Sequence, residues 1–261
     1  MTRILAALAL SSALAGIASA ADLSERIDDG GLSSGFALSV YGGANFSPHS
    51  SVDYSVPGFG SGSVTPAWDG ASFQMPPYYG VRATYWLDAM PQIGLAVDFT
   101  HAKVKADPVP APFSTLEFTD GINFLTLNAI YRHDLGMALT PYLGVGVGLS
   151  IPHVEAEIPG VTKTEEYQVT GVAANFFAGA DYAITDNWSV FGEYKFSYGQ
   201  VDADLNGGGS LQTDIISNQV ILGVLHAELI ARAYWAAIGR GSVSAGRSSA
   251  PPRSSSGASP P

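Results

Sequence analysis

The sequence predicts an all-β fold, an eight-stranded antiparallel transmembrane β-barrel of the outer-membrane type with long outer loops and short periplasmic turns. Eight segments alternate apolar and polar residues with the period of two that marks a β-strand. Short and long connections alternate between these segments. The chain is 46% hydrophobic and only 13% charged, yet after its first 20 residues it has no continuous apolar run of the ~20 residues that a membrane helix needs.

The first 20 residues are predicted to be a secretory signal peptide. Arg3 supplies the positive start, residues 4–17 are almost wholly apolar or small, and residues 18–20 (ASA) form a cleavage site. A membrane anchor is the alternative, but the apolar run is short for a span. We therefore expect a mature chain from Ala21, a periplasmic segment at residues 21–34, and a location in the outer membrane of a Gram-negative bacterium, reached through the barrel assembly machinery.

The barrel is predicted over residues 35–226. Its strands are expected at residues 36–46, 78–87, 93–104, 122–132, 142–151, 167–182, 188–198 and 216–226. One face of each of the first four strands is apolar: Phe36, Leu38 and Val40; Tyr79, Val81, Ala83, Tyr85 and Leu87; Ile93, Leu95, Val97 and Phe99; Leu125, Leu127, Ala129 and Tyr131. Such faces are expected to contact lipid.

The fifth strand has the clearest alternation. Large apolar residues from Leu143 to Ile151 alternate with Gly144, Gly146, Gly148 and Ser150. Large residues outward and glycine inward favour a narrow, packed lumen. The last two strands continue the outward apolar face with these residues: Trp188, Val190, Tyr194, Phe196, Tyr198, Val220, Leu222 and Val224.

The connections give the polarity of the barrel. Residues 88–92, 133–139 and 185–187 are short turns, whereas residues 47–77, 105–121, 155–166 and 200–213 are long and rich in Gly, Pro and Asp. The long loops are expected outside the cell, so the first strand begins in the periplasm. Aromatic residues at segment ends are predicted to form the interfacial girdles: Tyr41, Trp86, Tyr85, Tyr131, Tyr142, Tyr182, Trp188 and Tyr198.

The inward phase of the strands carries charges of both signs. These residues are Arg82, Asp98, Asn128, Arg132, Asp181, Glu193 and Lys195. A soluble lipocalin-like barrel or a β-sandwich would instead turn its apolar face inward. Charges that face one narrow closed space must pair, because an unpaired buried charge is very costly. We expect a structural salt-bridge network in the lumen.

Composition excludes several functions. The chain has no cysteine, which removes disulfides, thiolate nucleophiles and Cys-ligated metals. Residues 21–226 contain 7 of the 12 basic and 22 of the 23 acidic residues, so nucleic acid is not an expected partner. No glycine-rich phosphate loop lies between a strand and a helix. An acidic surface can still approach anionic lipid through bridging divalent cations.

The tail, residues 227–261, breaks the barrel pattern. Residues 242–261 are of low complexity and are predicted to be disordered. Small barrels usually close on a strand that ends in an aromatic residue, but Glu228 stands near that position. One hypothesis is a frameshifted or otherwise altered C-terminus, which resequencing of the gene's end would test.

Three histidines lie at the outer ends of predicted strands: His49, His101 and His153. His153 and Glu155 are two residues apart, so they share one face of a strand. Imidazole with carboxylate is a ligand set for a transition metal and for acid–base chemistry. The alternative is a solvated polar rim, which is common at barrel mouths, and the spacing matches no recognised metal motif.

Eight short stretches resemble the rhizobial-type lipid A oxidase family across about residues 38–224. They are residues 39–43 (SVYGG), 47–50 (SPHS), 68–70 (WDG), 75–84 (MPPYYGVRAT), 116–123 (LEFTDGIN), 140–144 (TPYLG), 151–155 (IPHVE) and 192–195 (GEYK). The resemblance implies an outer-membrane enzyme that acts on lipid A in lipopolysaccharide. It would oxidise the proximal glucosamine to 2-aminogluconate with molecular oxygen, depend on a divalent cation and release hydrogen peroxide.

Oxidation at the anomeric carbon needs a free hemiacetal, so the substrate must already lack its 1-phosphate. We predict His49, His101, His153 and Glu155 as metal ligands, with His153 and Glu155 also as the catalytic residues. Glu117 and Asp120 are second choices. The C-terminus departs from the family pattern and puts assembly of this chain in question.

Two other functions stay open. A non-enzymatic barrel that serves envelope integrity or adhesion would tolerate loss of the rim histidines. A lipid A deacylase would need a serine, a histidine and an acid close together, and Ser47, Ser50 and His49 are present without a nucleophile motif.

Overall fold

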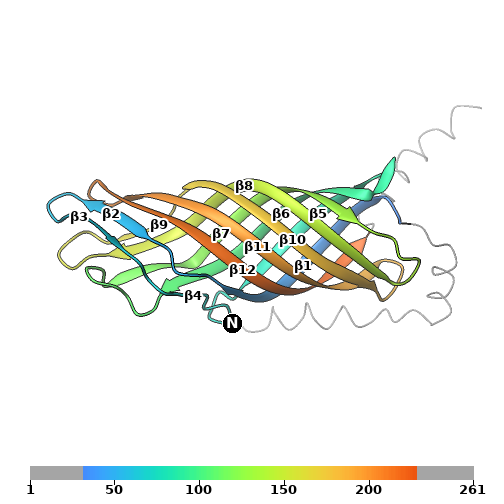
Figure 1. Ribbon diagram of the computed structural model, residues 1–261, viewed down its shortest axis with the longest axis horizontal. Helices are drawn as coiled ribbons and strands as arrows, with labels where there is room; N and C mark the ends of the chain where they lie inside the picture. The colour runs from blue at the N-terminus through green and yellow to red at the C-terminus, as the bar shows by residue number, and fades with distance from the viewer. Residues whose placement is uncertain (1–31, 228–261) are drawn as a thin grey trace, which may run out of the picture.

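The computed structural model describes residues 32–227, which form a closed barrel of antiparallel strands (Figure 1). The predicted signal peptide, most of the predicted 21–34 segment and the tail beyond Ala227 lie outside the described residues. Within residues 32–227 no helix is long and apolar enough to cross a membrane. The twelve strands are β1 (Gly35–Phe46), β2 (Val52–Val56), β3 (Gly60–Val64), β4 (Trp68–Asp69), β5 (Tyr79–Leu87), β6 (Met90–Ala106), β7 (Thr115–Arg132), β8 (Leu139–Glu157), β9 (Thr164–Tyr167), β10 (Gly171–Ala183), β11 (Trp188–Leu205) and β12 (Gly209–Ala227).

Eight of these strands form the barrel wall, in agreement with the sequence. Their order is β1, β5, β6, β7, β8, β10, β11 and β12, and β12 pairs back onto β1 to close the wall. The short turns at one end are confirmed, and seven of the eight predicted strands overlap single wall strands. The predicted strand at residues 167–182 is wrong at its start, because Tyr167 ends β9 and the wall strand β10 begins only at Gly171. Strand β12 runs one residue further than expected, because Ala227 pairs with Ala37 and so belongs to the barrel and not to the tail.

Four additional strands lie where the sequence predicts long loops. β2 and β3 form a hairpin that continues the sheet from the outer end of β12, β4 pairs with β6, and β9 pairs with β8. Several wall strands are also longer than expected; β11 runs to Leu205, and β12 begins at Gly209. The outer end is therefore an ordered extension of the barrel.

The two halves of the barrel use opposite alternation. In the half that ends in the short turns, which the sequence assigns to the periplasm, apolar side chains point outward, such as Leu127 and Leu222, which are 67% and 73% exposed on the outer wall. In the outer half apolar side chains point inward, for example Val201 and Leu211, while Asp202 on the same wall is exposed. Outward apolar residues suit a wall that faces lipid, and outward polar residues suit a wall that faces water.

The predicted aromatic girdle is partly wrong. Tyr85, Tyr131, Tyr182 and Trp188 are half-buried or exposed on the outer wall, but Tyr41 and Trp86 are only 3% and 8% exposed inside the barrel. Tyr142 also points inward and donates a hydrogen bond to Glu193. These three residues have inward phase, because each neighbours an outward apolar residue in the sequence. A position at the end of a strand therefore does not by itself place an aromatic side chain on the outer wall.

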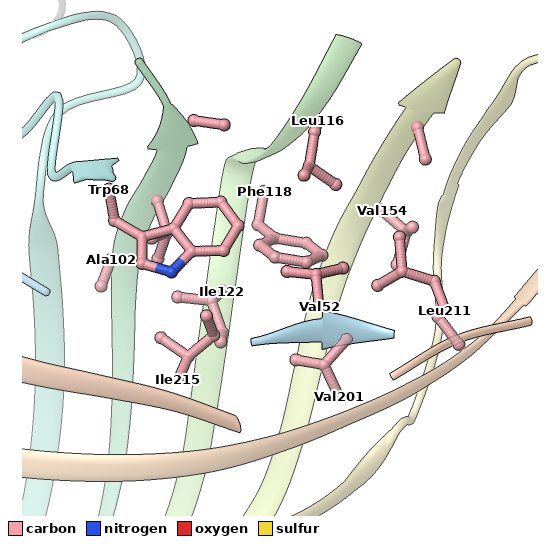
Figure 2. Close-up of a cluster of buried hydrophobic side chains, with 14 of the residues drawn as sticks. Val52, Trp68, Ala102, Leu116, Phe118, Ile122, Val154, Val201, Leu211 and Ile215 are labelled. Atoms are coloured by element: carbon pink, nitrogen blue, oxygen red, sulfur yellow. The ribbon is translucent and has the colours of Figure 1, made fainter. Parts of the chain in front are cut away.

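An apolar core fills the outer half of the lumen. Trp68 and Phe118 pack with ring centroids 6.0 Å apart, and Val52 from the β2–β3 hairpin is fully buried. Figure 2 shows these side chains converging with residues of β8, β11 and β12. This packing closes the outer mouth of the barrel at that level. It also explains why the outer loops form strands, since they cover a common core.

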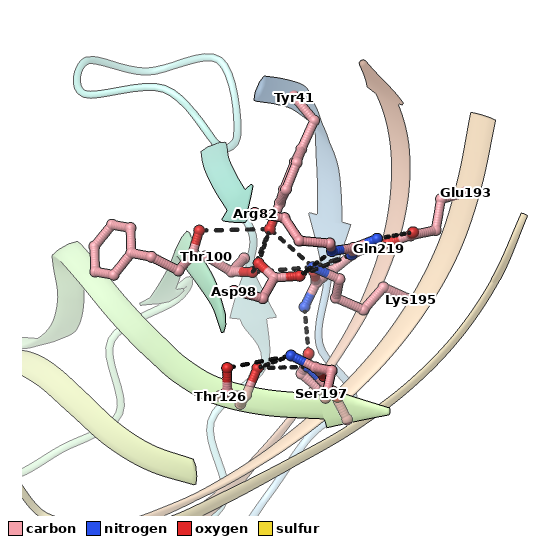
Figure 3. A network of polar contacts seen from close by, with 12 residues as sticks. Tyr41, Arg82, Asp98, Thr100, Thr126, Glu193, Lys195, Ser197 and Gln219 are labelled. Carbon is pink, nitrogen blue, oxygen red and sulfur yellow. Dashed lines mark hydrogen bonds and ion pairs between the residues drawn. The ribbon is translucent and has the colours of Figure 1, made fainter. Parts of the chain in front are cut away.

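A polar network fills the centre of the lumen, as the inward charges predict (Figure 3). Arg82 contacts Asp98 at 2.7 Å and Glu193 at 2.7 Å, and Lys195 contacts Asp98 at 2.9 Å. Tyr41 donates a hydrogen bond to the same Asp98. Two cations and two carboxylates thus balance in charge. The requirement for pairing in a narrow lumen is met.

Gly148 in β8 lies so close to the backbone of β7 that a larger residue is expected to disturb the packing of these two strands. A Cβ at Gly148 would lie 1.9 Å from the backbone oxygen of Leu125, which cannot move away without distorting β7. We expect Gly148→Ala to lower the free energy of unfolding by about 1–3 kcal/mol or more, as overpacking does. Urea unfolding in lipid vesicles measures this change. Val147→Leu on the exposed side of the same strand is the control, and an equal loss in both variants would contradict the prediction.

Candidate metal site

The candidate site lies on the outward face of β7, β8 and β9, beyond the outward apolar residues of the barrel wall. On β8, Val154 and Ala156 point inward and are buried in the apolar core of the outer half. The intervening His153 and Glu155 therefore point outward together. The predicted common face of these two residues is confirmed. The outward face means that the site is not reached through the lumen.

Asp120 reaches the same place through an irregularity in β7. The register between β7 and β8 shifts between Glu117 and Ile122, and Gly121 within this bulge has a φ of +111°. A β-bulge re-aims a side chain by inserting residues that have no partner across the ladder. The bulge brings the Asp120 side chain next to His153. In a regular β7–β8 ladder Asp120 would instead pair with a residue of β8.

The three side chains converge at ligand spacing. Nδ1 of His153 lies 3.4 Å from a carboxylate oxygen of Glu155 and 3.8 Å from one of Asp120. One ligand atom from each residue lies within 4.8 Å of the others. His153 is 8% exposed, and its buried Nδ1 has no hydrogen-bond partner among residues 32–227. A buried, unpartnered imidazole nitrogen that faces two carboxylates fits a cation, because all three are metal donors.

A row of charged residues runs across the strands next to this cluster. Glu155 stands opposite Glu117 on β7 and opposite Glu165 on β9. Like charges in direct cross-strand register are unfavourable. Lys163 offsets part of this cost, with its Nζ 2.6 Å from Glu165 and 3.6 Å from Glu155, and its hydrogen bond lowers the pKa of Glu165. Nζ of Lys105 lies 3.6 Å from a carboxylate oxygen of Glu117 and offsets the charge of that residue.

His101 lies near the cluster but is not one of its three members. Its Nδ1 is 2.9 Å from Oδ1 of Asn123, and Asn123 in turn donates through Nδ2 to the carbonyl oxygen of Ile151. That second bond orients the amide so that its oxygen faces His101, which assigns the proton to Nδ1. The ring also stacks on Tyr79 with centroids 4.9 Å apart. Nε2 then carries the lone pair; it is buried and has no hydrogen-bond partner in the part of the chain that the structure describes.

The other predicted site residues are spread over the outer end. His49 is exposed between β1 and β2 and is not a member of the cluster. Glu117 contributes to the charged row through Lys105 and not to the cluster. Asp120, a second choice from the sequence, is a full member. The period of two along a strand predicts that His153 and Glu155 share a face. The bulge that positions Asp120 could not be predicted in this way, and its one indication in the sequence is Gly121, which follows Asp120.

A separate cavity of about 140 Å³ lies at the periplasmic end of the barrel, where Trp86, Arg132 and Asp181 contribute to its lining. The Arg132 guanidinium stacks over the Trp86 ring at 3.8 Å. This cavity lies at the opposite end of the strands from the cluster of Asp120, His153 and Glu155. It is therefore not part of the candidate metal site.

A family model described as "Opacity family porin protein" matches residues 83–209. Among solved structures, the chain is similar to Neisserial surface protein A, with 18% identity, 75% of this chain and 98% of that chain covered, and a TM-score of 0.44. It is also similar to the outer membrane protein OprG from Pseudomonas aeruginosa, with 14% identity, 76% and 99% covered, and a TM-score of 0.41. No curated protein sequence matches significantly. The family match and the closed β-barrel with an apolar outer wall agree with the predicted outer-membrane class.

Proposed function

We propose that this outer-membrane β-barrel is a lipid A-modifying oxidase whose cation is held by Asp120, His153 and Glu155. The observation that supports this proposal most directly is the unpartnered Nδ1 of His153 between two carboxylates. The cluster lies on the outer wall beyond the lipid-facing residues. A lipid headgroup in the outer leaflet would reach it by lateral diffusion, without entering the packed lumen.

The proposed substrate is 1-dephosphorylated lipid A. The group that reacts is the hemiacetal carbon, C1, of its proximal glucosamine. The C1–H bond breaks and the C1 hydroxyl loses its proton, so that C1 becomes the carbonyl of a lactone. The two electrons and two protons reduce molecular oxygen to hydrogen peroxide. Water then opens the lactone to 2-aminogluconate, and the product is heavier than the substrate by one oxygen atom.

The residues of the cluster have two proposed roles, which are to bind a cation and to accept a proton. His153 and Asp120 would act as ligands, and Glu155 would be a further ligand or the base that takes the C1 hydroxyl proton. Thr119 donates to Glu155 at 3.2 Å and helps to orient its carboxylate. A bound divalent cation would polarise the sugar oxygen and stabilise the charge that develops on it.

A chelator is expected to abolish the reaction of the wild-type protein. The purified, refolded barrel would be incubated in air with 1-dephosphorylated lipid A, and mass spectrometry would detect the gain of one oxygen. We expect this product without chelator and none with EDTA, and recovery when excess divalent cation is added. No product from protein shown to be folded, at any cation tested, would contradict the proposed oxidase.

A non-enzymatic role is the second candidate, and the charged row favours it over the deacylase. Carboxylates that stand in register could bridge to lipopolysaccharide phosphates through divalent cations and so support envelope integrity. The deacylase finds no support among residues 32–227. Ser50 Oγ is bonded to Thr213 and Trp68, and His49 contacts neither a serine nor a carboxylate there.

A further inference from the structure

The segment between β4 and β5 carries the two most exposed large apolar side chains of the described barrel. Phe73 is 85% exposed and Met75 is 84% exposed, more than any large apolar residue on the lipid-facing wall. Trp68, only a few residues earlier, is instead 8% exposed and packs on Phe118 in the apolar core of the outer half. The same stretch of chain therefore divides into an inward anchor and an outward apolar tip.

The segment is held in place by hydrogen bonds from several strands. Lys103 on β6 donates from Nζ to the carbonyl oxygens of Gln74 and Met75, at 3.2 and 3.0 Å. Ser72 bonds the side chain and backbone of Asn45 on β1, at 2.9 Å each. These bonds fix the backbone on both sides of Phe73. Its exposure is thus a property of a fixed loop and not of a frayed one.

The loop lies just beyond the lipid-facing residues of β6. Lys103 lies four residues, or about 13 Å of strand, beyond Phe99 on the outward apolar face of β6. The loop leads directly into Tyr79, which is exposed on the outer wall and stacks on His101. The apolar tip therefore follows directly on the lipid-facing wall. It also lies close to the candidate metal site, because Lys103, which binds the loop carbonyls, interacts electrostatically with Asp120 and Glu155.

We propose that Phe73 and Met75 insert into the outer leaflet and contact the acyl chains of a lipid beside the candidate metal site. Two large apolar side chains exposed at this level gain free energy by leaving water for the acyl region. The occupant is a lipid chain because the loop continues a surface that already faces lipid. This inference needs only the membrane placement of the barrel and does not depend on the oxidase proposal.

Lipid-depth quenching tests the insertion directly. The chain contains no cysteine, so Phe73→Cys and Met75→Cys each give a single attachment point for the fluorophore NBD. The labelled barrels would be folded into phosphatidylcholine vesicles with and without lipid that carries a doxyl quencher at acyl position 5. Phe59→Cys, at the tip of the β2–β3 hairpin, is the water-exposed control, and Leu127→Cys on the outer wall is the lipid-exposed control.

We expect the labels at residues 73 and 75 to be quenched about twofold more strongly than the label at 59, approaching the label at 127. Quenching at 73 and 75 no greater than at 59 would overturn the proposal. Gel mobility before and after heating would confirm that each labelled barrel is folded. Because this readout needs no enzymatic turnover, its failure is distinguishable from failure of the proposed oxidase.

Discussion

Replacement of His153 by alanine is expected to abolish the oxygen gain in 1-dephosphorylated lipid A. His153 is the only imidazole of the three-residue cluster, and its Nδ1 lies within 3.8 Å of both carboxylates. Loss of this ligand would leave two carboxylates, one of them 53% exposed, to hold the cation. We expect product formation to fall by about 100-fold or more, since even residues that only support metal ligands often contribute 10–100-fold.

His49→Ala is the matched control for this variant. His49 also lies at the outer end, but it is exposed and outside the cluster. Its replacement is expected to leave the rate of product formation unchanged. Equal activity of His153→Ala and wild type would contradict the assignment of the cluster. An equal loss of product formation in both variants would show that activity depends on the outer end in general and not on the cluster of Asp120, His153 and Glu155.

Replacement of Asp98 by alanine is expected to produce the largest loss of stability. Asp98 is fully buried and contacts Arg82 and Lys195, so its removal leaves excess positive charge in the lumen (Figure 3). Breaking a buried pair in this way costs about 3–5 kcal/mol. We expect a loss of this size in the free energy of unfolding, measured by urea titration of the barrel in lipid vesicles.

Two comparisons separate charge imbalance from loss of packing. Asp202→Ala removes an exposed carboxylate that accepts a hydrogen bond from Gln212, and it is expected to change stability by less than about 0.5 kcal/mol. The double variant Asp98→Leu with Lys195→Met removes one charge of each sign and leaves the Arg82–Glu193 pair intact. It is expected to be more stable than Asp98→Ala. A double variant as unstable as the single one would show that packing, and not charge, dominates.

The opposite alternation of the two barrel halves links the fold to the candidate site. Where the wall faces lipid, the outward positions are Leu, Val and Phe; past that level the same outward phase on β8 continues as His153 and Glu155. The chemistry-bearing residues are thus an extension of the lipid-facing stripe. A headgroup anchored by acyl chains along that stripe would lie opposite them.

The sequence alone determined the eight wall strands, their lipid-facing residues, the short turns and the pairing of lumen charges. Each follows from the period of two along a strand, which is a local property. The common face of His153 and Glu155 follows from the same rule. The predicted aromatic girdle is partly wrong because three of its expected members, Tyr41, Trp86 and Tyr142, occupy inward positions.

Only the tertiary structure decided what the long loops do. The β2–β3 hairpin, β4 and β9 form because they pair with extended wall strands and cover an apolar core that residues distant in sequence build together. The bulge in β7 depends on register with β8, so the meeting of Asp120 with His153 is not visible in either strand alone. The outward tip at Phe73 and Met75 depends on anchors from β1 and β6. Such non-local contacts have no period in the sequence, and this is why periodicity could not predict them.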